Sequence, residues 1–185
     1  MSKVLTPIIF DIETTGLSPL DSRIVAIGIA KLPAKQVLIN EDEKAMIQEF
    51  LSFLHENVVL VGYNINNFDI PFITARALKH GLYEEIAIIR EVYRVDLMTL
   101  VSRYLLTNQK YIKLKEICQF LDIEVNDDIN GNDTPQLWEQ GNYQAIIDHC
   151  MSDIEITEKL FFKLESLALH NLKVRYGLKD VEFGW

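Results

Sequence analysis

Apolar and polar positions along the chain predict an alternation of strands and helices. Short apolar runs, rich in β-branched residues, are bounded by glycine, proline and polar residues, which is typical of strands. The turn-forming residues 18–22 separate two of these runs and therefore predict a pair of neighbouring strands. The predicted strands cover residues 7–12, 23–31, 36–40, 58–61 and 91–95.

Other segments repeat apolar residues at the three- and four-residue spacing of amphipathic helices. Helices are predicted for residues 42–55 and 113–121, and after an N-capping Asp96. A further helix is predicted from near Pro71 to Lys79, ended by Gly81, and a short one is opened by Pro135. Residues 125–134 are rich in Asn, Asp and Gly, and residues 174–185 show no clear pattern. The longest predicted helix covers residues 142–170, with an apolar stripe of Ile147, Cys150, Ile154, Phe161, Leu164 and Ala168.

This order of elements predicts an α/β fold, with a mixed central β-sheet flanked by helices. A length of 185 residues and a hydrophobic content of 49% suit one folded domain over residues 1–185, in which residues 171–185 form a tail of unknown role. No apolar run is long enough to span a membrane. The N-terminus, beginning with residues 1–4, lacks the long apolar region of a signal peptide. Cys118 and Cys150 have no metal-ligand spacing, so we expect buried free thiols and a cytoplasmic location.

The chain has a formal net charge of −9. Proteins that coat duplex nucleic acid independently of sequence are usually basic. A nucleic-acid partner would therefore be held locally, at a strand end, with metal ions supplying much of the positive charge. The same acidic balance is equally compatible with no nucleic-acid partner.

Two acids follow the first apolar run. In a strand, Asp11 and Glu13 point to the same face, where their carboxylates repel each other unless a cation lies between them. They predict a metal site at the end of a central strand. The alternative is a strand edge with two solvated acids.

Three further residues extend this candidate site. Asp69 follows the apolar strand 58–61, and a helix places His149 and Asp153 about one turn apart on one side. Each has a structural alternative, since Asp69 is also placed to cap the next helix and His149 with Asp153 to form a solvated pair.

The three acidic segments, taken in order, resemble the DEDD superfamily of 3′–5′ exonucleases. Residues 9–17 (IFDIETTGL) are similar to its first motif and residues 148–155 (DHCMSDIE) to its third. Residues 63–71 (YNINNFDIP) resemble the second motif of the proofreading domain of family B DNA polymerases. One position departs from this branch, which usually has tyrosine where this chain has His149, while the histidine branch places its histidine at the position of Asp148.

This resemblance implies a ribonuclease H-like fold and a metal-dependent 3′–5′ exonuclease acting on single-stranded DNA, or RNA, ends. Two Mg²⁺ or Mn²⁺ ions, about 3.5–4 Å apart, would support an in-line displacement at phosphorus. By resemblance, Asp11 bridges both ions, Glu13 and Asp153 hold the ion that activates water, and Asp69 serves the leaving-group side. His149 would orient or deprotonate the attacking water.

Residues beside the metals are candidates for substrate binding. Leu17 resembles a residue that wedges against terminal bases, and alternatively is a partly exposed turn leucine. Phe68 either stacks on a base or belongs to the core, and Asn64 bonds either the substrate or its own loop. Three lysines are candidates for phosphate contacts or a solvated face: Lys110, Lys113 and Lys115. The full candidate set is Thr14, Thr15, Gly16, Leu17, Asn64 and Phe68.

Two interpretations of function follow. The first is a stand-alone exonuclease, and the second is a catalytically weak or silent module on the same fold that binds nucleic acid or protein. The four acids favour the enzyme, whereas the histidine in place of tyrosine keeps the second interpretation open.

Overall fold

The computed structural model describes residues 2–106, 111–125 and 131–185. A mixed sheet forms its centre, in the strand order β3–β2–β1–β4–β5, with β6 pairing with the start of β1. Strands β4 and β6 run parallel to β1, and β2 runs antiparallel to it. The strands are β1 (Lys3–Thr14), β2 (Ile24–Lys31), β3 (Ala34–Ile39), β4 (Val58–Gly62), β5 (Tyr93–Asp96) and β6 (Val181–Phe183).

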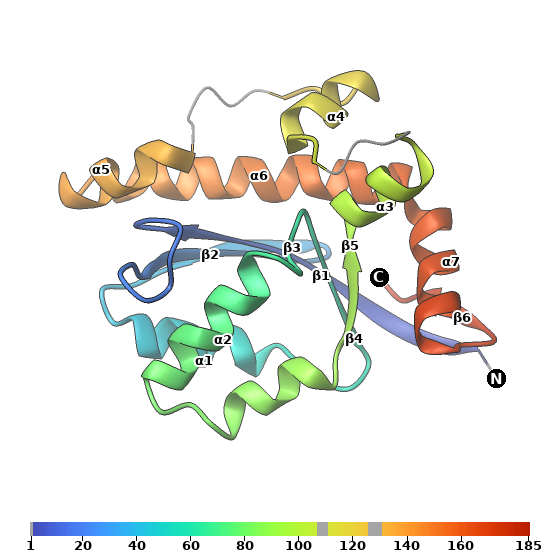
Figure 1. The fold of residues 1–185 in the computed structure, drawn as a ribbon, viewed down its shortest axis with the longest axis horizontal. Helices are drawn as coiled ribbons and strands as arrows, with labels where there is room; N and C mark the ends of the chain where they lie inside the picture. Colours follow the sequence, from blue (N-terminus) through green and yellow to red (C-terminus); the bar gives the residue numbers. More distant parts are fainter. Residues whose placement is uncertain (1, 107–110, 126–130) are drawn as a thin grey trace.

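Helices cover both faces of this sheet, as Figure 1 shows, with α6 along one face and α1 and α2 on the other. One face is packed by α1 (Glu43–Ser52), α2 (Asp69–Lys79) and the 3₁₀ helix η1 (Glu85–Arg90). The other is packed by α3 (Leu97–Tyr104), α4 (Leu114–Phe120), α6 (Tyr143–Lys163) and α7 (Glu165–Tyr176). The short helices η2 (Gly131–Asp133) and α5 (Thr134–Glu139) precede α6.

Strand β1 distributes its side chains between these two layers. Ile8, Phe10 and Ile12 belong to the core shared with α1 and α2, whereas Ile9 belongs to the core shared with α6. Because side chains alternate along a strand, the acids after Ile9 face α6. The strand therefore delivers its carboxylates to the layer that also contains the third predicted motif.

A buried ion pair ties the first turn of the chain to the α1–α2 layer. Both carboxylate oxygens of Glu43 accept hydrogen bonds from Arg76, at 2.6 and 2.9 Å, and one also accepts from the backbone N–H of Ile24. Nε2 of His80 lies 2.7 Å from the same carboxylate. Arg76 donates a further hydrogen bond to the carbonyl of Pro19, in the turn after β1. This network fixes the turn relative to α2, which begins with Asp69.

Most predicted elements are confirmed, and two predictions need correction. The helix predicted for residues 142–170 is divided at Leu164, because α6 follows the sheet face whereas α7 turns to pack against β5 and β6. The apolar stripe begins at the buried Ile146, while Ile147 is only partly buried. Residues 181–183, left unassigned by the sequence pattern, form β6, while residues 126–130 lie outside the described residues. Among the described helices, none is long and apolar enough to cross a membrane.

Candidate active site

A cavity of about 620 Å³ opens at the end of β1, beside α6 and the loop before α2. Three elements far apart in the sequence therefore meet around one space. The predicted site residues that line it are Asp11, Glu13, Thr14, Leu17, Asn64, Phe68, Asp69, His149 and Asp153.

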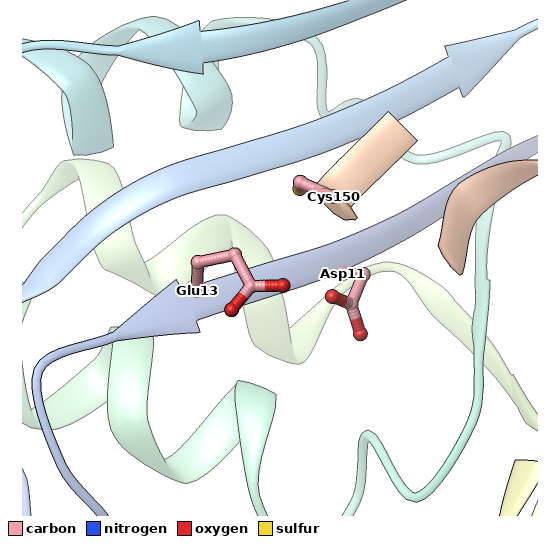
Figure 2. Close-up of side chains that lie close together, drawn as sticks. All are labelled: Asp11, Glu13 and Cys150. Carbon is pink, nitrogen blue, oxygen red and sulfur yellow. The ribbon is translucent and has the colours of Figure 1, made fainter. Parts of the chain in front are cut away.

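Asp11 and Glu13 project from the same face of β1, as Figure 2 shows. Glu13 is buried, and β1 lies inside the sheet between β2 and β4. The alternative of a strand edge with two solvated acids is therefore wrong for this strand.

Two neighbours fix the carboxylate of Glu13. The hydroxyl of Thr134, at the start of α5, donates a 2.8 Å hydrogen bond to Oε2, and Nε2 of His149 lies 3.4 Å from Oε1. Thr134 is fully buried. Thr134 is not predictable as a site residue from the sequence, because it follows an irregular segment and lies far along the chain from the acid of β1 that it contacts.

Helix α6 places His149 and Asp153 together, with 3.9 Å between Nε2 and Oδ2. His149 is only 3% exposed, so the alternative of a solvated pair is wrong. One nitrogen atom, Nε2, thus approaches both the acid of β1 and the acid of its own helix. This position suits an imidazole that exchanges a proton with a water molecule in the cavity.

Asp69 reaches the site from the first turn of α2. Its Oδ1 accepts a 3.2 Å hydrogen bond from the backbone N–H of Ile12, between the two acids of β1. The residue is buried, and it begins α2 rather than preceding it. The contact fixes α2 against β1 and brings the third acid to the same cavity.

Burial and mutual repulsion raise the pKa of two of these acids, Asp11 and Asp69. Burial, and then the charges of Asp69, Asp153 and Glu13, raise the pKa of Asp11 well above its ordinary value. Burial also raises the pKa of Asp69 to about 7, with further contributions from Asp96 and Glu13. Such a group of oxygen donors, which repel one another when ionised, fits one or more divalent cations.

Two sets of ligand atoms are close enough to share an ion. The atoms of Glu13, His149 and Asp153 lie within 4.8 Å of one another, and so do those of Asp11, Glu13 and Cys150. Both sets include Glu13, and only the second contains sulfur. The sequence pattern did not predict Cys150 near the site, since its spacing matches no ligand motif.

Asp96 orders the loop that carries Asn64. Its Oδ1 accepts the backbone N–H of Asn64 and of Thr99, the latter as the predicted N-cap of α3, and Oδ2 accepts from the N–H of Asn66. Asn64 has a positive φ of 62°, and its side-chain oxygen accepts a hydrogen bond from Asn67. Asn64 therefore bonds its own loop while it lines the cavity.

The turn after β1 holds Leu17 over the cavity. Thr14 donates through Oγ1 to the carbonyl of Gly16, and the backbone and hydroxyl of Thr15 pair with Arg23. Thr15 and Gly16 lie outside the cavity lining and shape the turn. Leu17 lines the cavity and is 82% exposed, so a ligand can cover it.

Aromatic and basic residues also line this cavity. Phe68 is partly buried, packs at 5.5 Å from Phe72, and still lines the cavity. Lys110 lies outside the described residues. The lining also contains Lys113 and Lys115, two of the predicted candidates for phosphate contacts. It further contains residues that were not predicted at the site: Ile12, Tyr63, Tyr111, Leu114, Gly131 and Asn132.

Comparison with known proteins places this geometry in a family. A family model described as the RNase_H superfamily matches residues 8–165. A protein of Methanocaldococcus jannaschii that is described only as uncharacterised is 36% identical over 164 residues, which cover 83% of this chain and 92% of that protein.

Two DNA polymerases are more distant relatives. The PolC-type DNA polymerase III of Caldanaerobacter subterraneus subsp. tengcongensis is 29% identical over 147 residues, covering 64% of this chain and 10% of the polymerase. A DNA polymerase of Archaeoglobus fulgidus is 24% identical over 202 residues, covering 96% of this chain and 25% of the polymerase.

A solved structure shares the fold. The family B DNA polymerase from Pyrobaculum calidifontis superposes with a TM-score of 0.70 at 21% identity, over 87% of this chain and 24% of the polymerase chain. These matches confirm the resemblance and the ribonuclease H-like α/β fold predicted from the three motifs. The chain spans a quarter or less of each polymerase.

Proposed function

The chain belongs to the RNase H superfamily, and on that premise we propose that it is a metal-dependent 3′–5′ exonuclease acting on single-stranded nucleic-acid ends. The superfamily and the similarity to DNA polymerases support a nuclease, and hence a hydrolase that binds nucleic acid. The 3′–5′ direction rests on the resemblance of the three motifs to those of DEDD exonucleases.

One observation carries the proposal. Four carboxylates from β1, α2 and α6 meet at a single cavity, and burial together with repulsion raises the pKa of Asp11 there. Structural acids are seldom gathered in this way without a counter-charge, whereas nucleases need such a group. The four residues are Asp11, Glu13, Asp69 and Asp153.

These four residues would hold two Mg²⁺ or Mn²⁺ ions, because hard divalent cations prefer carboxylate oxygens. When bound, the ions supply positive charge to the phosphodiester and to the attacking and leaving oxygens. Thr134 holds Glu13 in place for this task, and the N–H of Ile12 holds Asp69.

His149 is the proposed proton acceptor. Its Nε2 lies 3.4 Å from Glu13 and 3.9 Å from Asp153, so the two carboxylates orient the ring and stabilise it once it gains a proton. A water molecule in the cavity that loses its proton to this nitrogen becomes the nucleophile.

The terminal nucleotides are proposed to lie in the cavity, against Leu17 and Phe68. Leu17 and Phe68 offer apolar surface to the bases, and Lys113 and Lys115 offer positive charge to phosphates. Both groups line the same cavity as the acids.

The test is degradation of oligonucleotides labelled at the 5′ end, with DNA and RNA assayed in parallel. We expect a ladder that shortens from the 3′ end with Mg²⁺ or Mn²⁺, and no products in chelator. Asp11→Ala and Asp153→Ala should abolish hydrolysis and keep the fold, as judged by circular dichroism. Asp148→Ala is the matched control, because Asp148 is exposed on the same helix as Asp153.

Two outcomes contradict the proposal. A wild-type protein that degrades neither DNA nor RNA but retards their migration would indicate a silent binding module. Cleavage at a wild-type rate by Asp11→Ala or Asp153→Ala would remove the acids from the active site.

A further inference from the structure

A buried thiol lies directly beside the two acids of β1. The sulfur of Cys150 and carboxylate oxygens of Asp11 and Glu13 all lie within 4.8 Å of one another. Figure 2 shows Cys150 above the two acids, on a segment of α6, which contacts both β1 and β2. The residue is 0% exposed.

The absence of a side chain at Gly28 makes room for this sulfur. In the antiparallel pairing of β1 with β2, Gly28 is the direct partner of Asp11, so both positions face the same side of the sheet. A Cβ atom at Gly28 would lie 2.8 Å from Sγ of Cys150 and 2.6 Å from Cγ1 of Ile154. The thiol thus fills the place where a side chain next to Asp11 would be.

We propose that Asp11, Glu13 and Cys150 form a binding site for a thiophilic divalent cation, Zn²⁺ or Cd²⁺, which overlaps the site of the hard cations. Thiolate ligands favour Zn²⁺ and other soft metals, whereas Mg²⁺ and Mn²⁺ favour carboxylates. Because this ligand set contains a sulfur atom as well as two carboxylates, it favours a thiophilic ion over Mg²⁺ or Mn²⁺.

The spacing of the ligand atoms suits such an ion. Tetrahedral Zn²⁺, with bonds of about 2.3 Å to sulfur and about 2.1 Å to oxygen, places these ligands roughly 3.6 Å apart. The ligand atoms lie within 4.8 Å of one another, so side-chain rotations must bring them closer when the ion binds. Ligation replaces the thiol proton, which passes to the solvent while the sulfur–metal bond forms.

Binding has a consequence for the other cations. Because Asp11 and Glu13 belong to both sites, a thiophilic ion and Mg²⁺ or Mn²⁺ cannot use them independently. Zinc should therefore inhibit hydrolysis, and this consequence, unlike the binding itself, rests on the proposed nuclease function.

The test is titration of the full chain with Cd²⁺, followed by the ultraviolet charge-transfer absorption of a cadmium–thiolate bond. This readout needs no activity, so it separates failure of this inference from failure of the proposed function. The chain has two cysteines, and Cys118 is buried in α4, on another element. We expect the band in the wild type and in Cys118→Ser, and its loss in Cys150→Ser.

A second variant tests the carboxylates without removing sulfur. Glu13→Gln should keep the band but weaken Cd²⁺ binding by at least the roughly 10–100-fold that loss of an outer-shell partner costs. Added Mn²⁺ should raise the Cd²⁺ concentration needed for the half-maximal band. No band in the wild type, or a band that persists in Cys150→Ser, would overturn the inference. So would unchanged Cd²⁺ affinity in Glu13→Gln, which would leave Cys150 as a packing residue over Gly28.

Discussion

The hydroxyl of Thr134 donates a 2.8 Å hydrogen bond to the carboxylate of Glu13, although 121 positions of the chain separate the two residues. Both side chains are buried. The bond fixes one oxygen of Glu13 while His149 lies beside the other. The geometry of this acid therefore depends on α5, which carries no acidic motif.

Replacing Thr134 by valine should weaken metal binding and leave the fold intact. Valine matches threonine in shape and removes the donor, and loss of such outer-shell partners typically costs roughly 10–100-fold in metal affinity or activity. Calorimetric titration with Mn²⁺ measures the affinity. Thr134→Ser keeps the hydroxyl and should bind almost as the wild type does. Equal Mn²⁺ affinity in Thr134→Val and wild type would show that the hydrogen bond has no role in orienting Glu13.

Asp69 should make the metal-free protein less stable as the pH rises. Its pKa is raised from 3.8 to about 7 in the folded state, so folding favours the protonated form. Its contribution to stability is thus greatest below pH 3.8, declines as the pH rises toward 7, and is lowest above it. Asp69→Asn keeps an acceptor for the N–H of Ile12 and lacks this titration.

Melting temperatures in chelator at about pH 5 and about pH 8 test this prediction. The advantage of Asp69→Asn over the wild type should grow with pH, and each 1 kcal/mol corresponds to about 2–4 °C for a chain of this size. Saturating Mg²⁺ should remove the difference by pairing with the ionised acid. A difference that is the same at both pH values would exclude a raised pKa at Asp69.

His149→Ala should lower the rate by roughly 10²–10⁴-fold, the usual contribution of a general base. The wild-type rate should rise with pH as the imidazole loses its proton. The variant His149→Tyr should retain part of the activity, and the low-pH part of its pH–rate profile should shift, because tyrosine stays protonated at neutral pH. Single-turnover rates at saturating Mg²⁺ measure both effects. His55→Ala is the control, since His55 is exposed and does not line the cavity. If the rate of His149→Ala and its dependence on pH equal those of the wild type, no side-chain base is needed.

Leu17→Ala should raise KM without changing stability. Leu17 and Leu20 are both 82% exposed on the same turn, but only Leu17 lines the cavity. Loss of about 1–2 kcal/mol of apolar contact with a substrate corresponds to roughly 5–30-fold in KM. Steady-state rates on a short oligonucleotide compare Leu17→Ala with Leu20→Ala. Equal KM values for the two variants would remove Leu17 from the substrate path.

Arg76→Leu should destabilise the protein by roughly 3–5 kcal/mol, because it leaves Glu43 charged and buried with a weaker counter-charge. The double variant Glu43→Leu/Arg76→Leu should recover part of this loss. Burial raises the pKa of Glu43, but the hydrogen bonds from Arg76 and His80 outweigh it and hold the pKa below 4.5. The stability that this pair adds is therefore present above pH 4.5 and is lost as the pH falls through the lowered pKa. Urea unfolding measures each variant, and a double variant no more stable than Arg76→Leu would contradict this account.

The sequence predicts the strands well because their signals are local. The apolar run before Asp11 and the alternation after it determine both the strand and the face on which its acids lie. The position of Asp153 near that face also follows from helical spacing. The division of the helix at Leu164 does not follow from helical spacing, because the apolar stripe continues through this residue. The chain turns there because α7 packs against β5 and β6.

The sequence does not predict the contacts made by three residues of the site: Thr134, Asp96 and Cys150. Asp96 was predicted as a helix cap, and its hydrogen bonds to the loop of Asn64 depend on β4 and β5 being neighbours. Thr134 meets Glu13 because α5 packs near the end of β1, and Cys150 meets Asp11 because Gly28 lies opposite that acid. Each contact joins residues distant in the chain and leaves no local pattern.

The docking of α6 on β1 also determines when the site comes into existence. The acids of β1 meet His149 and Asp153 only after a helix from the far part of the chain has packed across them. Closing so long a loop is entropically costly, and contacts of this kind form slowly during folding. A newly synthesised or partly unfolded chain would thus carry the acids of β1 without the partners that α6 supplies. The rate at which hydrolysis recovers during refolding would report when α6 packs on β1. A nuclease built in this way is inactive until its fold is complete.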